Sequence, residues 1–218
     1  MMKTAILFAC VVLLFTAGIS ASSIYSLIMN GDIESAADSL SKYSTASLRD
    51  GNVLFCAGLL QADAEESVRL MEAALNVSVA AVYREQIYYR RAQYYFIKKD
   101  YDKLHQITTD YHALWETGRY GKDMQRYSIL INEMSDKYES ALRQADRYYL
   151  LYGYDDDAQW GKIDKARVML RNHKRIGAGN ILRKLSREKS GPGVPQALYL
   201  LALDAASQSR TDDAVLYY

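Results

Sequence analysis

A helical-hairpin pattern occurs twice in this chain, in the ranges 89–104 and 197–218. Each copy has a small residue, a packed residue three places later, a polar corner, and another packed residue twelve places after the small one. These positions are Ala92, Tyr95, Lys99–Asp100 and Leu104 in the first copy, and Ala202, Ala205, Ser209–Arg210 and Ala214 in the second. Small residues at such points allow two antiparallel helices to approach closely, and large residues three or four places away fill the flanks. The pattern therefore predicts pairs of antiparallel helices.

Both copies resemble tetratricopeptide repeats, whose helix–turn–helix units stack into a solenoid. Weaker versions of the pattern occupy the ranges 25–40, 53–75, 127–152 and 157–189. In the last of them, Gly177 and Gly179 stand where the family has a polar corner and a packed Ala. The spacing between units also drifts from the usual ~34 residues. The resemblance implies an all-α, right-handed superhelical solenoid of about five to six antiparallel helix pairs.

The composition also favours an all-α chain. Tyr occurs 19 times, against 4 Phe and 2 Trp, and its ring can pack between helices while its hydroxyl stays at the wet rim. The two prolines, Pro192 and Pro195, stand close together, and the sequence has no long alternation of apolar and polar residues. Gly153 predicts the end of one helix, and an Asp near position 157 predicts the N-cap of the next.

The first 21 residues have the three parts of a secretory signal. Lys3 supplies a positive start, the range 5–15 is apolar, and small residues follow up to Ala21. We therefore predict a signal peptide over residues 1–21, removed after about Ala21, and a helical-repeat domain over residues 22–218. The mature chain would then be periplasmic or secreted, with no transmembrane span.

Two other interpretations of this segment remain open. An uncleaved N-terminal membrane anchor is one, although the apolar run is shorter than the ~20 residues that cross a bilayer. A lipoprotein processed at Cys10 is the other, and it is disfavoured because the apolar run continues past that residue.

Charge and cysteine content bear on two classes of protein. The chain has 27 basic and 26 acidic residues, so removal of Lys3 with the signal would bring the mature net charge near zero. A general nucleic-acid binder would be strongly basic, so we expect no nucleic-acid partner. Removal of Cys10 would leave Cys56 alone, without an internal disulfide. Because Cys56 lies in the apolar run 53–57, we predict a small core residue rather than a reactive thiol.

No constellation of residues in the sequence indicates catalysis. His105 and His112 are seven places apart, whereas a zinc pair on a helix prefers i,i+4 spacing, and His173 is remote from both. The acidic run 155–157 lacks the alternating ligands and the Gly of a calcium loop. We therefore predict a protein that is not an enzyme and that has no catalytic, cofactor-binding or metal-binding residues.

Charge is distributed unevenly along the chain. The range 162–189 has ten Lys or Arg against two acids, and the range 32–75 has eight acids against three bases. One interpretation is that both are solvated outer faces. The other is that the basic range contacts an acidic partner or an anionic surface, such as lipid head groups or a cell-wall polymer.

The resemblance also implies a binding surface, because the first helix of each hairpin in that family lines a concave groove. The residues that would face this groove are Gln86, Tyr89, Arg90, Gln93 and Phe96 in the first copy, and Gln196, Tyr199 and Leu203 in the second. Such a mixture of aromatic and polar side chains suits an extended peptide. The alternative is that Tyr89 and Phe96 serve only to pack one repeat against the next.

The sequence thus predicts an exported, non-catalytic scaffold of the cell envelope or periplasm that binds a peptide or partner protein on its concave face. Two alternatives are the helical, non-catalytic part of a cell-wall enzyme similar to lytic transglycosylases, and a solenoid fused to a peptidoglycan-binding module. Both require sequence beyond Tyr218. The last hairpin breaks off with Tyr217 and Tyr218 still in its apolar pattern. Because solenoids normally end in a polar capping helix, we also expect the reading frame to continue.

Overall fold

The structure is a computed structural model that describes residues 20–43, 49–154 and 157–217. These ranges contain twelve α-helices and no strand, and the helices form six successive antiparallel pairs. The pairs are α1 (Ala21–Met29) with α2 (Ile33–Ser41), α3 (Gly51–Leu60) with α4 (Ala64–Asn76), α5 (Ala81–Ile97) with α6 (Tyr101–Leu114), α7 (Gly121–Met134) with α8 (Tyr138–Tyr152), α9 (Ala158–Arg171) with α10 (Arg175–Ser186), and α11 (Gly193–Ser207) with α12 (Thr211–Leu216). The all-α prediction and the expected number of pairs are confirmed.

Some sequence predictions fall on residues that the structure does not describe. The predicted signal peptide lies outside the described residues except for Ser20 and Ala21, and Asp155 and Asp156 lie outside them as well. Ser20 is the N-cap of α1, where its side chain accepts a hydrogen bond from the Ser23 amide.

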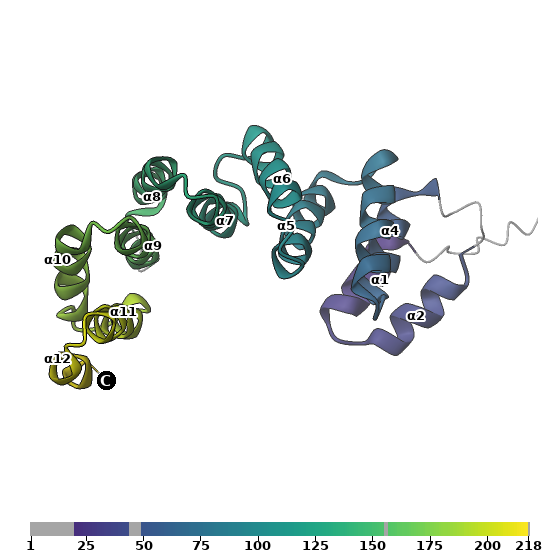
Figure 1. The fold of residues 1–218 in the computed structure, drawn as a ribbon. Helices are drawn as coiled ribbons and strands as arrows, with labels where there is room; N and C mark the ends of the chain where they lie inside the picture. The colour runs from purple at the N-terminus through teal and green to yellow at the C-terminus, as the bar shows by residue number, and fades with distance from the viewer. Residues whose placement is uncertain (1–19, 44–48, 155–156, 218) are drawn as a thin grey trace, which may run out of the picture.

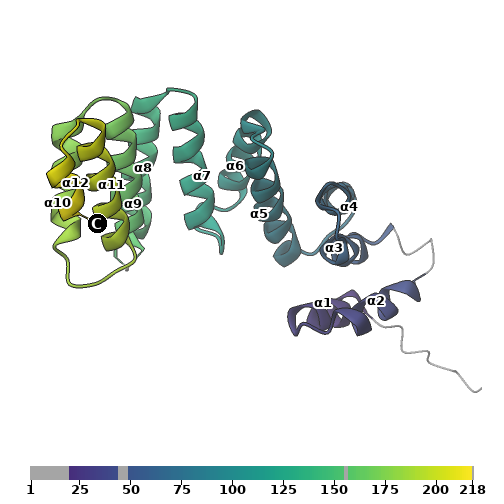
Figure 2. The same cartoon turned by 60° about the horizontal axis from the view of Figure 1, so that its bottom comes forward.

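The helices are arranged in two rows. Each odd-numbered helix contacts the next odd-numbered helix, and each even-numbered helix contacts the odd-numbered helices on either side of it in the chain. Within the described part of the chain, no two even-numbered helices are in contact. The result is an arc in which α5, α7, α9 and α11 lie on the inside and α6, α8 and α10 lie on the outside (Figure 1). Figure 2 shows the same pairs following one another along the molecule. This is a solenoid-like arrangement, as predicted.

One type of corner recurs between paired helices. Five corners in the described residues contain a residue with left-handed backbone, namely Gly31 (φ 81°), Lys99 (φ 59°), Asp136 (φ 55°), His173 (φ 56°) and Ser209 (φ 57°). In each, the following amide donates to the carbonyl five residues before it, at 2.8 to 3.0 Å, which is the bonding of a Schellman C-cap. The last four of these corners, at residues 99, 136, 173 and 209, are separated by 37, 37 and 36 residues. Such a regular spacing is compatible with a helical-repeat fold.

One expectation about the fifth pair was wrong. Gly177 and Gly179 lie inside α10, and His173 forms the corner before it. A Cβ at position 177 would meet only the end of the flexible Met169 side chain. Asp157 is the N-cap residue of α9, as predicted, although its side chain makes no capping hydrogen bond. That side chain accepts a hydrogen bond from Lys122 Nζ at 2.7 Å. Gly153 follows the last residue of α8, as predicted.

The buried interior extends along the solenoid and does not form one central core. Successive clusters of buried side chains lie between neighbouring hairpins, and their fully buried members include Phe55, Ile87, Leu104, Ile129 and Leu182. Cys56 is a free, buried member of the first cluster, which confirms its predicted place in the core. Burial raises the pKa of its thiol to about 11, so the sulfur is protonated at neutral pH.

Candidate functional site

A groove of ≈ 340 Å³ lies between α5, α7 and α9. These helices belong to three successive pairs and lie along the inside of the arc in Figure 1. The lining residues are Tyr89 and Phe96 from α5, Asp123, Arg126, Tyr127 and Leu130 from α7, and Asp164 and Arg167 from α9. A ligand in the groove would therefore contact three repeats at once.

One side of the groove is aromatic. The Tyr89 ring stacks on Tyr120, with centroids 4.3 Å apart and planes at 9°. The Phe96 ring lies 5.4 Å from that of Tyr127, so α5 and α7 meet through two ring pairs. Burial, with the nearby charge of Asp123, raises the pKa of Tyr89 to about 12. The hydroxyl of Tyr89 consequently stays protonated over the physiological pH range.

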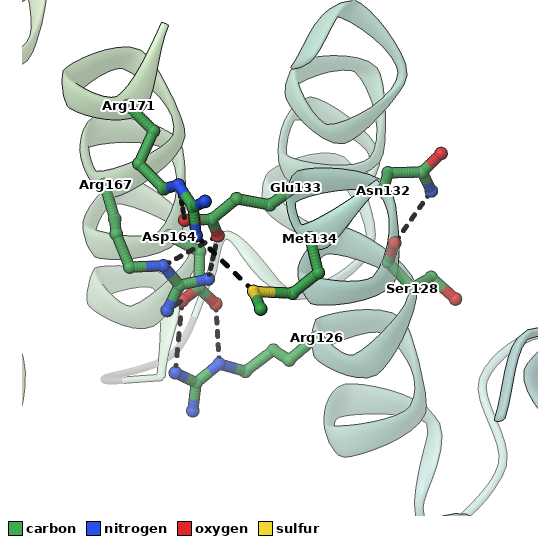
Figure 3. A network of polar contacts seen from close by, with 8 residues as sticks. All are labelled: Arg126, Ser128, Asn132, Glu133, Met134, Asp164, Arg167 and Arg171. Atoms are coloured by element: carbon green, nitrogen blue, oxygen red, sulfur yellow. Dashed lines mark hydrogen bonds and ion pairs between the residues drawn. The ribbon is translucent and has the colours of Figure 1, made fainter. Parts of the chain in front are cut away.

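The other side of the groove is charged, and a buried carboxylate organises it. The Asp164 side chain is only 1% exposed. Its Oδ2 accepts from Arg126 Nε at 2.7 Å, and its Oδ1 accepts from Arg126 Nη2 at 3.3 Å. Arg167 Nη1 lies 3.0 Å from the same Oδ1. Figure 3 shows both guanidinium groups converging on this carboxylate from α7 and α9.

A second buried acid, Glu133, extends the network. Its side chain is 2% exposed, and its Oε2 accepts from Arg167 Nε at 2.8 Å. Arg171 Nε lies 3.9 Å from Glu133 Oε1, and Arg171 Nη1 lies 3.4 Å from the sulfur of Met134 (Figure 3). Buried charges are tolerated when they are paired in this way. Three arginines therefore share two acids across the contact between α7 and α9.

The network fixes the position of the guanidinium groups that face the groove. The side chains of Arg126 and Arg167 remain about one third exposed, at 32% and 31%. The guanidinium of Arg126 also lies 4.7 Å from the centre of the Trp160 ring. Burial acts to lower the pKa of Arg126, but the hydrogen bond and charge of Asp164 outweigh it and raise that pKa. The groove therefore combines partly exposed rings with guanidinium groups whose positions are fixed by the buried acids.

The residues predicted to bind a partner occupy different environments. Tyr89 and Phe96 line the groove together. On the same helix Arg90 is exposed and Gln93 is half-buried. Gln86 is buried, and its Oε1 accepts from the Tyr25 hydroxyl at 3.0 Å, so it joins α5 to α1. The ring pairs of Tyr89 and Phe96 show that both residues also pack one repeat against the next, as the alternative interpretation proposed.

The three predicted residues on α11 lie away from this groove. Tyr199 and Leu203 are 49% and 53% exposed, and Gln196 is half-buried. Leu203 borders a separate hollow with Leu170 and Asp204. The partner-binding role of all these residues stays a prediction.

Sequence reasoning missed the charged side of the groove. Asp164 and Arg126 are 38 residues apart, and Arg167 and Glu133 are 34 apart, so no local motif joins them. The available signal was the position of Asp164 itself. Asp164 directly follows the buried Ile163, and the other buried residues of its helix are mainly small or apolar. A buried acid on such a face requires basic partners from a neighbouring element.

The structure adds two findings about metal sites and membrane spans. Among the described residues, no group of three or more His, Cys, Asp or Glu is placed to hold a metal ion. Within the same residues, no helix has the length and apolar character needed to cross a membrane. No protein-family model matches the sequence, and no curated protein was found to match it.

Proposed function

We propose that the chain is an exported, tetratricopeptide-like interaction scaffold of the cell envelope or periplasm, and that it performs no catalysis. Its site would be the groove between α5, α7 and α9, and its ligand an extended segment of a partner protein. The observation that carries this proposal is the pairing of an aromatic side, including Phe96, with guanidinium groups fixed by the buried Asp164. Aromatic and Arg side chains supply most of the binding energy at protein interfaces.

The chemistry of the groove suits a peptide because both kinds of contact are present along it. Rings provide contact area at low entropic cost. Guanidinium groups donate to the carbonyl or carboxylate oxygens of an extended backbone. Because Arg126 and Arg167 are already held by Asp164, their side chains lose little further freedom on binding. The same rigidity gives the site a fixed spacing between its apolar and its polar contacts.

Site-specific photo-crosslinking in the intact envelope tests the proposal. A photoreactive phenylalanine analogue is placed at position 96, which is 37% exposed in the groove, or at position 97 as a control. Ile97 is 76% exposed on the same helix but does not line the groove. We expect a discrete crosslinked protein from position 96 and little or none from position 97, identified by mass spectrometry.

Binding of the identified partner segment is then measured with purified variants. We expect Phe96→Ala to weaken binding by about tenfold and Ile97→Ala to leave it unchanged. Equal crosslinking at the two positions, or full binding by Phe96→Ala, would rule out the groove as the site. Amino-terminal sequencing of the exported protein checks the location separately, with a first residue near position 22 expected.

A further inference from the structure

The basic range 162–189 is largely neutralised by acids from neighbouring helices. Its ion pairs are Lys162–Glu188, Lys165–Asp146, Arg167–Asp164, Arg167–Glu133, Arg171–Glu133, Lys174–Glu139 and Arg175–Asp204. Within the described part of the chain, Arg183, Lys184, Arg187 and Lys189 have no acidic partner. The uncompensated positive charge is therefore concentrated at the carboxyl-terminal end of α10 and in the turn that follows.

A second hollow, of ≈ 250 Å³, lies beside this unpaired charge. It is bounded by α8 and α10, which belong to the outer row, and α9 lies between them. Its apolar lining comes from Ala145, Tyr149, Gly161, Ile181 and Leu185. Its charged lining comes from Asp146, Lys162, Lys165, Lys184 and Glu188. We call this hollow the outer pocket.

The charges around the outer pocket are not balanced. Lys165 Nζ lies 2.5 Å from Asp146 Oδ1, and Lys162 Nζ lies 3.5 Å from Glu188 Oε1. Lys184 is exposed and makes no ion pair among the described residues, although Glu188 lines the same pocket and pairs with Lys162. A cation in the last turn of a helix is favourable for the helix dipole, which explains Lys184 as a contributor to stability. That effect does not require the apolar hollow next to it.

We propose that the outer pocket docks an acidic segment of a partner protein. One bulky apolar side chain of that segment would insert against Ile181 and Leu185, beside Tyr149, and an adjacent carboxylate would pair with Lys184. Small-molecule sites usually measure about 300–1,000 Å³, so a hollow of ≈ 250 Å³ fits a single anchoring side chain better than a whole ligand. The nearby unpaired Arg187 and Lys189 would attract the acidic segment during its approach.

This surface is separate from the groove between α5, α7 and α9. The groove belongs to the inner row, whereas the outer pocket opens between two helices of the outer row. The two proposals can therefore fail independently, and a partner on each face would make the solenoid a bridge between two proteins.

A set of soluble, fluorescently labelled peptides tests the outer pocket directly. Short acidic peptides carry each amino acid in turn at one central position, and their binding to the full chain is measured by fluorescence anisotropy. Peptides with a central Leu, Phe or Trp should bind best, and exchange of the flanking Glu for Lys should abolish binding. Failure of every acidic peptide to bind, or equal binding whatever the central residue, would overturn the proposal.

Two matched pairs of variants assign the binding to this pocket. Tyr149→Ala should weaken it by about tenfold, while Leu150→Ala, at an adjacent exposed position outside the pocket, should not. Lys184→Glu should also weaken it by about tenfold, whereas Arg187→Glu, with the same charge change outside the pocket, should have a much smaller effect. Far-UV circular dichroism on heating confirms that each variant is folded.

A membrane surface is the alternative that the charge variants distinguish. If vesicles containing phosphatidylglycerol bind the chain, and Lys184→Glu and Arg187→Glu weaken that binding equally while no peptide binds, the unpaired cations serve an anionic surface and the docking proposal is wrong.

Discussion

The two halves of the solenoid join successive hairpins by different contacts. In the N-terminal half, α1–α6, rings from neighbouring hairpins pack together. Tyr25, Phe55 and Tyr83 come from α1, α3 and α5, and their centroids lie 4.8 to 5.9 Å apart. In the C-terminal half, α7–α12, ion pairs join neighbouring hairpins in addition to their buried apolar side chains. Among the described residues of this half, the aromatic ring pair is Tyr148 with Tyr152, and it lies within one helix.

The ion pairs of the C-terminal half connect each helix pair to the next. Asp164 on α9 joins Arg126 on α7, and Asp146 on α8 joins Lys165 on α9. Arg175 at the start of α10 lies 3.3 Å from Asp204 on α11. The N-terminal half contains one contact of this kind in its described residues, between Arg91 on α5 and Glu72 on α4; its other described pairs join residues three or four places apart.

The difference shows that one repeat fold can be held together by two kinds of interaction, namely the packing of rings and ion pairs. The free energy gained by burying rings depends on the apolar area removed from water and is insensitive to salt. Exposed ion pairs contribute little and are screened, whereas buried pairs such as Arg126–Asp164 are screened much less and are costly to break. The two halves should therefore respond differently to core truncation, charge removal and pH.

The largest effect should come from truncating the aromatic contacts. Phe55 is fully buried, and Phe55→Ala should lower the free energy of unfolding by about 3–5 kcal/mol. Because the lost interaction is apolar, the loss measured by urea unfolding should be the same at low and at high sodium chloride concentration. A loss that shrinks strongly in salt would contradict the role given to aromatic packing in the N-terminal half.

A smaller but still substantial effect should follow from removing the buried acid of the C-terminal half. Asp164→Asn should cost about 2–3 kcal/mol, because two guanidinium groups lose the negative charge and one of the two acceptor oxygens that they share. The matched control is Asp146→Asn, whose side chain is 61% exposed, and which should cost less than about 1 kcal/mol. Urea unfolding of both variants checks this ranking. Equal costs would mean that the buried network contributes no more than a surface pair.

The smallest effect concerns His112, which lies where the two halves meet. Its Nε2 is 3.4 Å from Ser128 Oγ on α7, and its buried Nδ1 has no hydrogen-bond partner. Burial lowers the pKa of His112 below its usual 6.5; the charge of Arg147 adds to this, and that of Glu116 opposes it. The folded chain therefore binds a proton less readily than the unfolded chain. Stability from this residue is complete above the unfolded pKa of 6.5, and it is lost progressively as the pH falls below 6.5 and through the lower pKa of the folded chain.

Thermal unfolding between pH 7.5 and pH 5.5 tests this expectation. The melting temperature of the unmodified chain should fall on acidification, and His112→Gln should reduce that fall. His105→Gln is the control, because His105 is exposed, and it should behave like the unmodified chain. An unchanged pH dependence in His112→Gln would show that the ring is not the titrating group.

Local spacing made the hairpins and most of the core predictable from the sequence. Ala92, Leu104, Ala202 and Ala205 are buried where the pattern placed them, because contacts at i, i+3 and i+4 on a helix are fixed by its geometry. The corners at Lys99 and Ser209 lie where the pattern placed them, whereas those at Asp136 and His173 were not located. Asp136 and His173 adopt a left-handed backbone that is typical of glycine, and therefore carry little local signal. This explains why Gly177 was mistaken for part of a corner.

The candidate site was predictable only on its aromatic side. Phe96 and Tyr89 were accessible to sequence reasoning because both lie on one helix. The charged side depends on Arg126 and Asp164, which come from two hairpins, and the register between hairpins is set by packing rather than by local spacing.

The sequence by itself determined that the chain forms paired helices, where their close contacts lie, and that Cys56 belongs to the interior. These properties depend on interactions between residues a few places apart. The tertiary structure alone decided which charges of the basic range are paired and which remain free. Glu133 is buried and paired with Arg167, while Lys184 makes no ion pair in the described part of the chain, and nothing in their local sequence distinguishes these environments. The physical reason is that a side chain's dielectric surroundings and its partners come from helices tens of residues away.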